Sequence, residues 1–305
     1  MNDPRGSRLR RRICHALPLI AMLGTALQVH AANLEVDGTR LAYEEAGSGE
    51  VVLFVHGAVS DHRVWTMFRD RVAERYRFVA YDQRYFGPAD WPDEAEDFDL
   101  ATHVDDLIAV VDALGDEPVH LVTWSYGGLV GLHAALRNPE KFRSIVHYEP
   151  TVEALHAGLS GERAAITQKF ASFGPMATAL QEGTKNEAVR RLIEAVFRMD
   201  TGAADEMSDE VQRMWDENAR TLTPFLEALG AAEPVSCGDL ATLDVPTLVM
   251  QGSEAYVLDA MMADEVVRCQ HNARSLVLQD ANHGGPVQQP DAFVDAALEF
   301  VSSAR

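Results

Sequence analysis

The sequence predicts an α/β fold in which a mostly parallel central sheet is flanked by helices and carries one inserted helical segment. Three observations predict it. Short β-branched and apolar runs alternate with helical stretches from residue 34 onward, as in repeated strand–helix–strand units. The run VVLFVHG at residues 51–57 is continuously apolar, which is typical of a strand buried on both faces. Residues 151–236 contain no such run and are rich in helix-forming sequence, so they predict an insertion between two strands.

The elements follow one another in a regular order along the chain. LEVDGTRLAYEEAG, which starts at residue 34, has the turn residues Asp37 and Gly38 between two alternating runs and predicts a β-hairpin. After the strand at 51–57, further strands are expected at 78–84, 119–125, 142–150, 245–252 and 274–280. Helices are expected up to about Arg75, over Ala101 to Leu114, from Tyr126, near 257–269 and from Asp291.

This order divides the chain into a core and an insertion. Residues 32–150 and 237–305 are expected to form the sheet and its covering helices. Residues 151–236 are expected to form a helical cap, because they contain the stretches NEAVRRLIEAVFRM and EMSDEVQRMWDENARTL.

Residues 1–31 have the layout of a secretory signal peptide. Four arginines between residues 8 and 12 precede the apolar run ICHALPLIAMLGTALQV, and VHAA at 29–32 supplies small residues for cleavage after Ala31 or Ala32. The alternative is an uncleaved membrane anchor. It is less favoured because the run contains His15 and is short against the ~20 residues that a span needs. We therefore expect an exported protein, periplasmic or secreted.

The charge of the chain restricts its partners. Removal of residues 1–31 takes away five arginines and one aspartate, so the formal charge of −21 becomes −25. A surface this acidic repels nucleic acid and anionic lipid. We therefore expect a small-molecule partner, no nucleic acid, and no stable membrane association after signal cleavage.

Cysteines and metal ligands give weaker signals. Cys14 leaves with the signal peptide, and Cys237 and Cys269 remain in a compartment that permits a disulfide. Two cysteines far apart in a domain of this size more often stay unpaired, so the free thiols are favoured and the bridge is the alternative. No ligand-type residues have zinc spacing, so neither a metal site nor a cofactor is expected.

The stretch TWSYGG at 123–128 lies between a predicted buried strand and a predicted helix. Thr123 and Gly127 flank Ser125 at its second neighbours, where a tight strand-to-helix turn leaves room only for small side chains. The helix N-terminus beneath the serine supplies free N–H groups and a positive dipole end. The first small position is usually glycine, so Thr123 is a modest departure. Ser125 is therefore the candidate nucleophile, against the alternative of a small polar residue ending a buried strand.

Several motifs together resemble the α/β-hydrolase superfamily over about residues 34–303. WSYGG, HGA followed by Trp65, DQRYFG at 82–87, the PTLV strand and the late NHGG fall where that family has them. More narrowly, RYFGPADWP, YEP and the NARTL before SCGDL look like small serine hydrolases with a helical cap. The resemblance implies the fold, a catalytic triad and hydrolysis of an ester-like bond, and it implies no particular substrate.

The resemblance also implies an oxyanion hole. In this architecture the residue after His-Gly and the residue after the nucleophile each give one backbone N–H, which here would be Ala58 and Tyr126. His56 lies too early in the chain for the base, so we interpret it as a structural histidine that binds loop backbone.

The base is expected late in the chain, in the loop after the last strand. RSLVLQDANHGGPVQQPDAF has His283 there, followed by two glycines and the terminal helix. Among eleven histidines, this one stands at the strand–loop–helix junction that the order serine, acid, histidine requires.

The acid is where the sequence departs from the family. Most members have aspartate three residues after the glycine that ends the next-to-last strand, and here that position is Ala255. Two carboxylates are candidates to replace it. Glu149, at the end of the strand after the nucleophile helix, is favoured over Glu254 because a strand end followed by Pro150 is a stiff platform. A third interpretation has Glu149 only capping the first helix of the insertion.

Other residues near these motifs have structural interpretations. Asp82 and Arg84 are expected to form an ion pair or loop clamp, and Asp280 to face solvent or cap a loop. Apolar residues of the insertion are expected to pack the cap, with some facing an apolar pocket for acyl or alcohol groups. They are Phe170, Phe173, Met176, Phe197, Met199 and Trp215.

These expectations combine into an exported serine hydrolase for a small carboxylic ester or lactone, acting through Ser125, His283 and Glu149 and an acyl-enzyme. A serine at this turn argues against haloalkane dehalogenase and epoxide hydrolase chemistry. Two alternatives stay open. One is a catalytically silent hydrolase-like binding protein, suggested by Ala255 and opposed by the intact Ser125 and His283. The other is an acyltransferase or perhydrolase with the same triad, which nothing in the sequence separates from a hydrolase.

Overall fold

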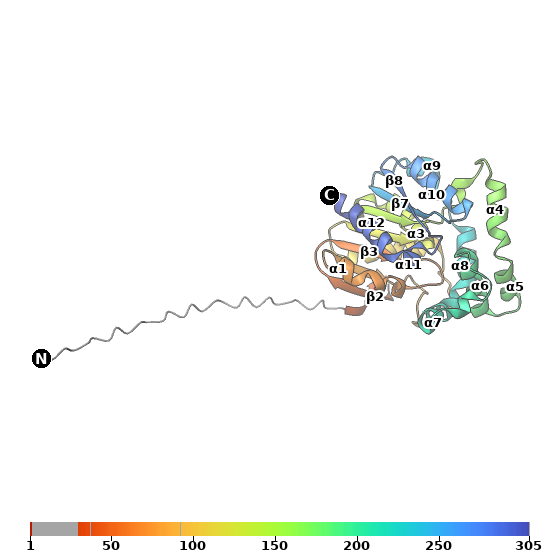
Figure 1. Cartoon of the computed structure of the whole chain (residues 1–305), viewed down its shortest axis with the longest axis horizontal. Coiled ribbons are helices and arrows are strands. Elements are labelled where there is room, and N and C mark those ends of the chain that lie inside the picture. The colour runs from red at the N-terminus through yellow and green to blue at the C-terminus, as the bar shows by residue number, and fades with distance from the viewer. Residues whose placement is uncertain (2–29, 37, 92, 305) are drawn as a thin grey trace.

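The computed structural model describes the chain except residues 2–29, 37, 92 and 305 (Figure 1). The expected signal peptide and its apolar run therefore lie almost wholly outside the described residues. Within the described residues, none of the helices combines the length and the apolar character that a bilayer span requires. The first described strand begins at His30, so the expected cleavage after Ala31 or Ala32 falls inside that strand.

A mixed sheet of eight strands forms the centre of the molecule, with the strand order β1-β2-β4-β3-β5-β6-β7-β8. The hairpin of β1 and β2 is antiparallel, β2 pairs antiparallel with β4, and all other pairs are parallel. The strands are β1 His30–Val36, β2 Thr39–Gly47, β3 Val51–Val55, β4 Arg77–Tyr81, β5 Val119–Trp124, β6 Phe142–Tyr148, β7 Thr247–Gly252 and β8 Ala273–Leu278. The predicted α/β fold with a mostly parallel sheet is confirmed.

Helices cover the sheet, as the alternation of apolar runs predicts. They are α1 Arg69–Ala73, α2 Leu100–Leu114, α3 Tyr126–Arg137, α10 Val257–Cys269, α11 Gly285–Gln288 and α12 Pro290–Ser303. Phe293 of α12 packs its ring against Trp65 and Phe68, which themselves contact Phe54 of β3. The stretch expected as helix before Arg75 is mostly a 3-10 helix, η1 His62–Phe68, whose first turn is capped by the side chain of Asp61.

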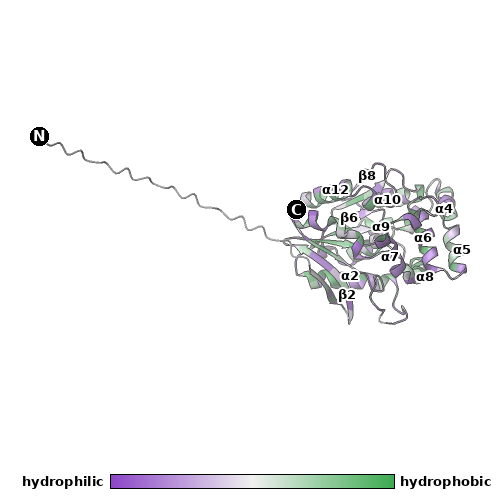
Figure 2. Cartoon of the chain, turned by 60° about the horizontal axis from the view of Figure 1, so that its bottom comes forward, coloured by the Kyte–Doolittle hydropathy of each residue, from purple (hydrophilic) through white to green (hydrophobic). Residues whose placement is uncertain are grey.

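Between β6 and β7 the described chain forms helices and no strand. These helices are η3 Glu153–His156, α4 Glu162–Ala171, α5 Gly174–Gln181, α6 Lys185–Val196, η4 Ala203–Glu206, α7 Asp209–Asn218, η5 Ala219–Thr221, α8 Leu222–Ala231 and α9 Cys237–Leu240. Figure 1 shows α4 to α8 gathered on one side of the sheet. In Figure 2 the helices of this group carry both hydrophobic and hydrophilic residues, as expected for helices with one buried face.

A buried asparagine ties the inserted helices to the core. Asn218, at the end of α7, donates from Nδ2 to Asp61 Oδ2 at 2.7 Å, and its Oδ1 accepts the N–H of Gly87 at 2.7 Å. Asn218 and Asp61 are both 0% exposed. Because both ends of the amide are satisfied away from water, this contact fixes where α7 meets the loops after β3 and β4.

The expectation that Cys237 and Cys269 are unpaired is wrong. Their sulfur atoms form a disulfide, with the two Cα atoms 5.0 Å apart. Cys237 begins α9, which leads into β7, and Cys269 ends α10, which follows β7. A helix that follows a parallel strand runs back toward the start of that strand. The two cysteines therefore meet at one end of the sheet although 32 residues separate them.

Candidate active site

Ser125 occupies a strained turn between β5 and α3. Its backbone has φ 55° and ψ −118°, a region that non-glycine residues rarely adopt. The turn is held from both sides: the N–H of Ser125 donates to Tyr148 O at 3.0 Å, and its carbonyl accepts the N–H of Gly128 and of Thr151. A strained serine fixed in this way is a feature of functional turns rather than of ordinary strand ends.

Glycines make this turn possible. A Cβ atom at Gly127 would lie 2.5 Å from the carbonyl oxygen of His56, and one at Gly128 would lie 2.6 Å from Pro150 Cβ. The structure also accounts for Thr123, where the family usually has glycine. Thr123 is buried, and a Cβ at Gly131 would lie 3.0 Å from its methyl group, so the glycine on α3 leaves the space that threonine needs.

Glu149 and His283 come together from the two parts of the core sequence, which lie before and after the inserted helices. Nδ1 of His283 lies 2.8 Å from Oε2 of Glu149, and Oε1 of the same carboxylate accepts the N–H of Gly252 at 2.9 Å. Glu149 is 2% exposed and has a positive φ of 41°. The bond at Nδ1 sets the tautomer in which Nε2 is free to act as a base.

The loop of His283 is anchored on both sides. Trp124 Nε1 donates to the carbonyl of His283 at 2.9 Å, and Tyr148 Oη donates to the carbonyl of Asn282 at 2.5 Å. The rings of Trp124 and Phe197 stack 5.9 Å apart, and each lies about as far from the imidazole, at 6.2 and 6.4 Å. These contacts hold the imidazole against an apolar wall.

The other candidate acid lies elsewhere. Glu254 is exposed, its N–H donates to Ala281 O at 2.8 Å, and its carbonyl accepts from Arg198. The structure thus brings Glu149, and not Glu254, to the imidazole. Because β6 lies between β5 and β7, its carboxyl end is next to both the nucleophile turn and the glycine that ends β7.

A second carboxylate near the imidazole was not anticipated. Asp259, in the first turn of α10, is 3% exposed, and its carboxylate lies within 4.8 Å of Glu149 and of a ring nitrogen of His283. Lys169 of α4 forms an ion pair with it. Asp259 lies four residues after Ala255, in the first turn of the helix that follows β7. The sequence shows an acidic residue there, but only the fold shows that its side chain reaches the imidazole.

The proposed oxyanion donors flank the serine. Tyr126 is the first residue of α3, so its N–H has no partner within the helix. Ala58 follows β3 and lines the same cavity as Ser125. A Cβ on the intervening Gly57 would lie only 3.2 Å from Ser125 Cβ, so this loop runs directly against the nucleophile.

His56 has the structural contacts expected of it. Its Nδ1 lies 2.8 Å from Gly57 O, and its Nε2 accepts the N–H of Gln83 at 3.1 Å. Burial lowers the pKa of His56, against the opposing charge of Asp82, which favours the neutral ring. The ring therefore joins the loop of Ala58 to the loop after β4.

Asp82 and Arg84 do not pair with one another, which corrects one of the two interpretations given to them. Asp82 accepts the N–H of His62 at 2.8 Å, and Arg84 makes a two-pronged contact with Asp106 at 2.9 and 2.6 Å. Each side chain therefore binds a different neighbour: Asp82 holds the loop after β3, and Arg84 holds α2. Asp280 is exposed, as expected.

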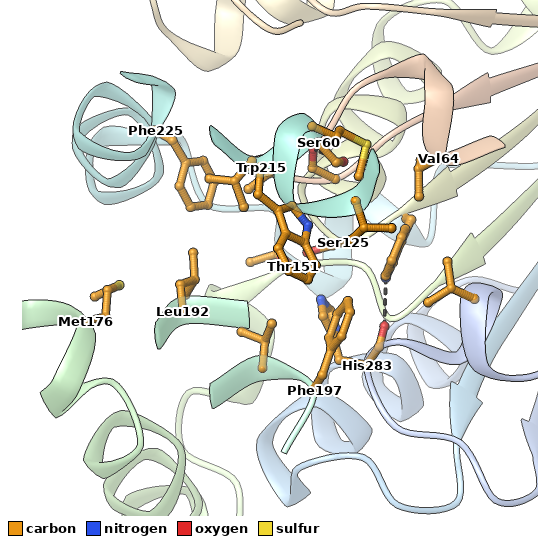
Figure 3. Close-up of a pocket in the computed structure, with 18 of the residues that line it drawn as sticks. Ser60, Val64, Ser125, Thr151, Met176, Leu192, Phe197, Trp215, Phe225 and His283 are labelled. Carbon is orange, nitrogen blue, oxygen red and sulfur yellow. Dashed lines mark hydrogen bonds between the residues drawn. The ribbon is translucent and has the colours of Figure 1, made fainter. Parts of the chain in front are cut away.

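A cavity of about 600 Å³ opens beside Ser125 and His283, between the core and the inserted helices (Figure 3). Trp215, Phe225, Leu192 and Met176 from the inserted helices point toward it. Of the apolar residues expected to pack the cap, five line this cavity: Phe170, Phe173, Met176, Phe197 and Trp215. Met199 is partly buried and packs against the core instead.

Residues 52–296 match the sequence model of a family described as "Alpha/beta hydrolase family". A curated relative, "Uncharacterized hydrolase YraK" of Bacillus subtilis (strain 168), is 27% identical over 131 residues, 43% of this chain and 48% of the relative. The matched stretch thus spans about half the length of that relative.

Two solved structures show the same fold. The "enol-lactonase from Burkholderia xenovorans LB400" is 18% identical with a TM-score of 0.71, over 88% of this chain and 99% of that one. A "thermophilic esterase from Thermogutta terrifontis (malate bound)" is 20% identical with a TM-score of 0.68, over 90% of this chain and 99% of that one. At these identities the likeness is one of fold.

Proposed function

The chain belongs to the alpha/beta hydrolase family, and from that membership we propose that it is an exported serine hydrolase that cleaves a small carboxylic ester or lactone. One observation carries the proposal. The carboxylate of Glu149 lies 2.8 Å from Nδ1 of His283, in a site whose cavity also contains a serine with φ 55°. A nucleophile on a strained turn, a base and an acid that orients the base are the three parts of acyl transfer.

The proposed reaction has two halves. Ser125 Oγ attacks the ester carbonyl while His283 Nε2 takes the hydroxyl proton, and Glu149 stabilises the imidazolium that forms. The N–H groups of Ala58 and Tyr126 donate to the oxyanion. Collapse of this intermediate breaks the ester bond, and His283 returns the proton to the leaving alkoxide. Water then attacks the acyl-serine with His283 as base, which releases the acid and restores Ser125.

Export is part of the proposal and rests mainly on residues 1–31. The disulfide between Cys237 and Cys269 supports it, because disulfides persist in oxidising compartments such as the periplasm and the cell exterior. The acidic surface is also in keeping with an exported protein that avoids anionic lipid.

The proposal is tested with a panel of p-nitrophenyl esters of increasing acyl length beside several lactones, together with labelling by a fluorophosphonate. We expect hydrolysis of at least one class and one labelled serine, with Ser125→Ala abolishing both. Absence of labelling in the folded protein would favour a silent binding protein. Product analysis with an added alcohol acceptor separates hydrolysis from acyl transfer.

A further inference from the structure

Two basic side chains besides His283 line the cavity next to Ser125, among the residues that the structure describes: Lys169 and Arg63. Lys169 projects from α4 and forms an ion pair with Asp259 of α10. The two side chains are 14% and 4% exposed, so this is a largely buried pair. A buried ammonium that already has a carboxylate partner carries little unbalanced charge into the cavity.

The charge of Arg63 is neutralised by two carboxylates. Its Nε and Nη2 bind Asp61 Oδ1 and Oδ2 at 2.8 and 2.6 Å, and Nη2 also binds Glu217 at 2.6 Å. Burial opposes ionisation of Asp61, but the hydrogen bonds and charge of Arg63 outweigh it and lower the pKa of Asp61. Two carboxylates thus stand against one guanidinium, and Asn218 further fixes Asp61.

The remaining charged side chains near the site are acidic. Glu210 of α7 lines the cavity, and Glu149 lies within 4.8 Å of Asp259 beside the imidazole. Most of the rest of the wall is apolar, from residues such as Val64, Leu192, Trp215, Phe225 and Leu229. A substrate carboxylate that entered this space would lose its water and meet carboxylates, with each cation already bonded.

We infer, on the basis of the proposed function, that the site takes esters or lactones whose chains are uncharged and apolar and rejects those that carry a carboxylate. The pair of Lys169 and Asp259 sets this selectivity. Asp259 forms an ion pair with Lys169 close to His283 and neutralises the charge of that lysine. An anionic chain in the pocket therefore does not find a free cation there.

The experiment compares two esters of equal acyl length: p-nitrophenyl hexanoate and the mono-p-nitrophenyl ester of adipic acid, which ends in a carboxylate. We expect kcat/KM for the hexanoate to exceed that for the adipate by about a hundredfold or more at pH 7.5. A ratio within about threefold of unity would overturn the inference.

Variants then test the residue pair. Asp259→Asn frees Lys169 and should lower the ratio by about tenfold or more, while Lys169→Met leaves Asp259 unpaired and should raise it. The double variant should return the ratio to the wild-type value or above.

The control is Glu299→Gln, which removes the same charge from an exposed position on α12 and should leave the ratio unchanged. The ratio is the readout because Asp259 lies close enough to His283 to alter both rates together. An unchanged ratio in both single variants would show that the pair of Lys169 and Asp259 does not set the selectivity.

A binding measurement separates failure of this inference from failure of the proposed function. Trp124 and Trp215 line the cavity, so ligands can be followed by quenching of tryptophan fluorescence. Octanamide should bind at least about tenfold more tightly than octanoate, even in a protein that hydrolyses neither ester. Hydrolysis of none of the esters and lactones in the panel would refute the proposed function, whereas tighter binding of octanoate would refute the selectivity.

Discussion

Oε2 of Glu149 lies 2.8 Å from Nδ1 of His283, across 134 residues of sequence. Three strand ends build this contact. Glu149 follows β6, Gly252 ends β7 and donates its N–H to Oε1, and His283 follows β8. In most of the family the acid follows β7, at the position that is Ala255 here. In this chain the carboxylate follows the neighbouring strand, β6.

This relationship predicts the effect of removing the acid. Glu149→Gln should lower kcat by about two to four orders of magnitude with KM little changed, because an imidazole without its orienting carboxylate adopts the wrong tautomer. Steady-state kinetics on the best p-nitrophenyl ester measures it. Glu254→Gln is the control and should cost about tenfold or less. The opposite ranking would assign the acid to the loop after Gly252, and no effect of either would leave a serine–histidine dyad.

Trp215 should set the acyl length that the site accepts. It is 4% exposed and lines the cavity, so Trp215→Leu enlarges the cavity. We expect the ratio of kcat/KM for long-chain esters to kcat/KM for the acetate ester to rise by about tenfold. Phe170 also lines the cavity but is 52% exposed, so the same change there should have a smaller effect.

Trp91 provides the control for this prediction. It is outside the cavity, where its ring lies under the guanidinium of Arg220 at 4.8 Å. Trp91→Leu should change stability without changing the ratio of rates between long and short esters. A uniform loss of rate in Trp215→Leu, at all acyl lengths, would mean that this side chain only holds the fold together.

The mature N-terminus should lie at Ala32 or Asn33. In the structure β1 pairs with β2 through contacts such as Asn33 with Ala42 and Leu34 with Leu41, so cleavage there shortens the strand but keeps its register. N-terminal sequencing of the exported protein tests this. A sequence that begins at Met1 or Asn2 on protein recovered outside the cytoplasm would show that no signal peptide is removed.

The disulfide should stabilise the fold. A bridge across 32 residues restricts the unfolded chain and is worth about 4 kcal/mol. The double variant Cys237→Ser/Cys269→Ser should lower the free energy of unfolding in urea by that amount, and reductant should do the same to the wild type. Two free thiols titrated in unreduced, unfolded protein would contradict the bridge.

Stability should fall as the pH drops below 6.5. Burial lowers the pKa of His147 from 6.5 to about 3, so the unfolded chain binds a proton in this range that the folded chain does not. Stability from such a group is present above the unfolded pKa and is lost as the pH falls. The loss for one histidine is about 2 kcal/mol at pH 5. Burial likewise lowers the pKa values of His103 and His120 to about 4, so they add to the decline.

His147→Asn should reduce this dependence. Asparagine can still accept from Thr123, whose hydroxyl lies 2.6 Å from Nδ1 of His147, and it does not titrate. Urea unfolding at pH 5, 6 and 7 measures the slope of stability against pH in both proteins. Equal slopes would show that His147 takes up its proton in the folded state.

The local parts of the architecture followed from the sequence alone. The expected helix near 257–269 forms over Val257–Cys269, and the expected hairpin forms with its turn after Val36. The sequence also predicted the turn that carries Ser125, because the small residues that allow this turn are neighbours of Ser125 in the chain. Such signals are local: side-chain periodicity, turn residues and small residues at fixed offsets act within a few positions of the chain.

The tertiary structure decided which distant side chains meet. It brought Glu149 rather than Glu254 to His283, joined Cys237 to Cys269, and brought Lys169 to Asp259 near that histidine. No local pattern encodes these contacts. The contact of Glu149 with His283 arises because the strand order β5-β6-β7-β8 places successive carboxyl ends side by side. The disulfide arises at the other end of the sheet, because α10 runs back toward the start of β7.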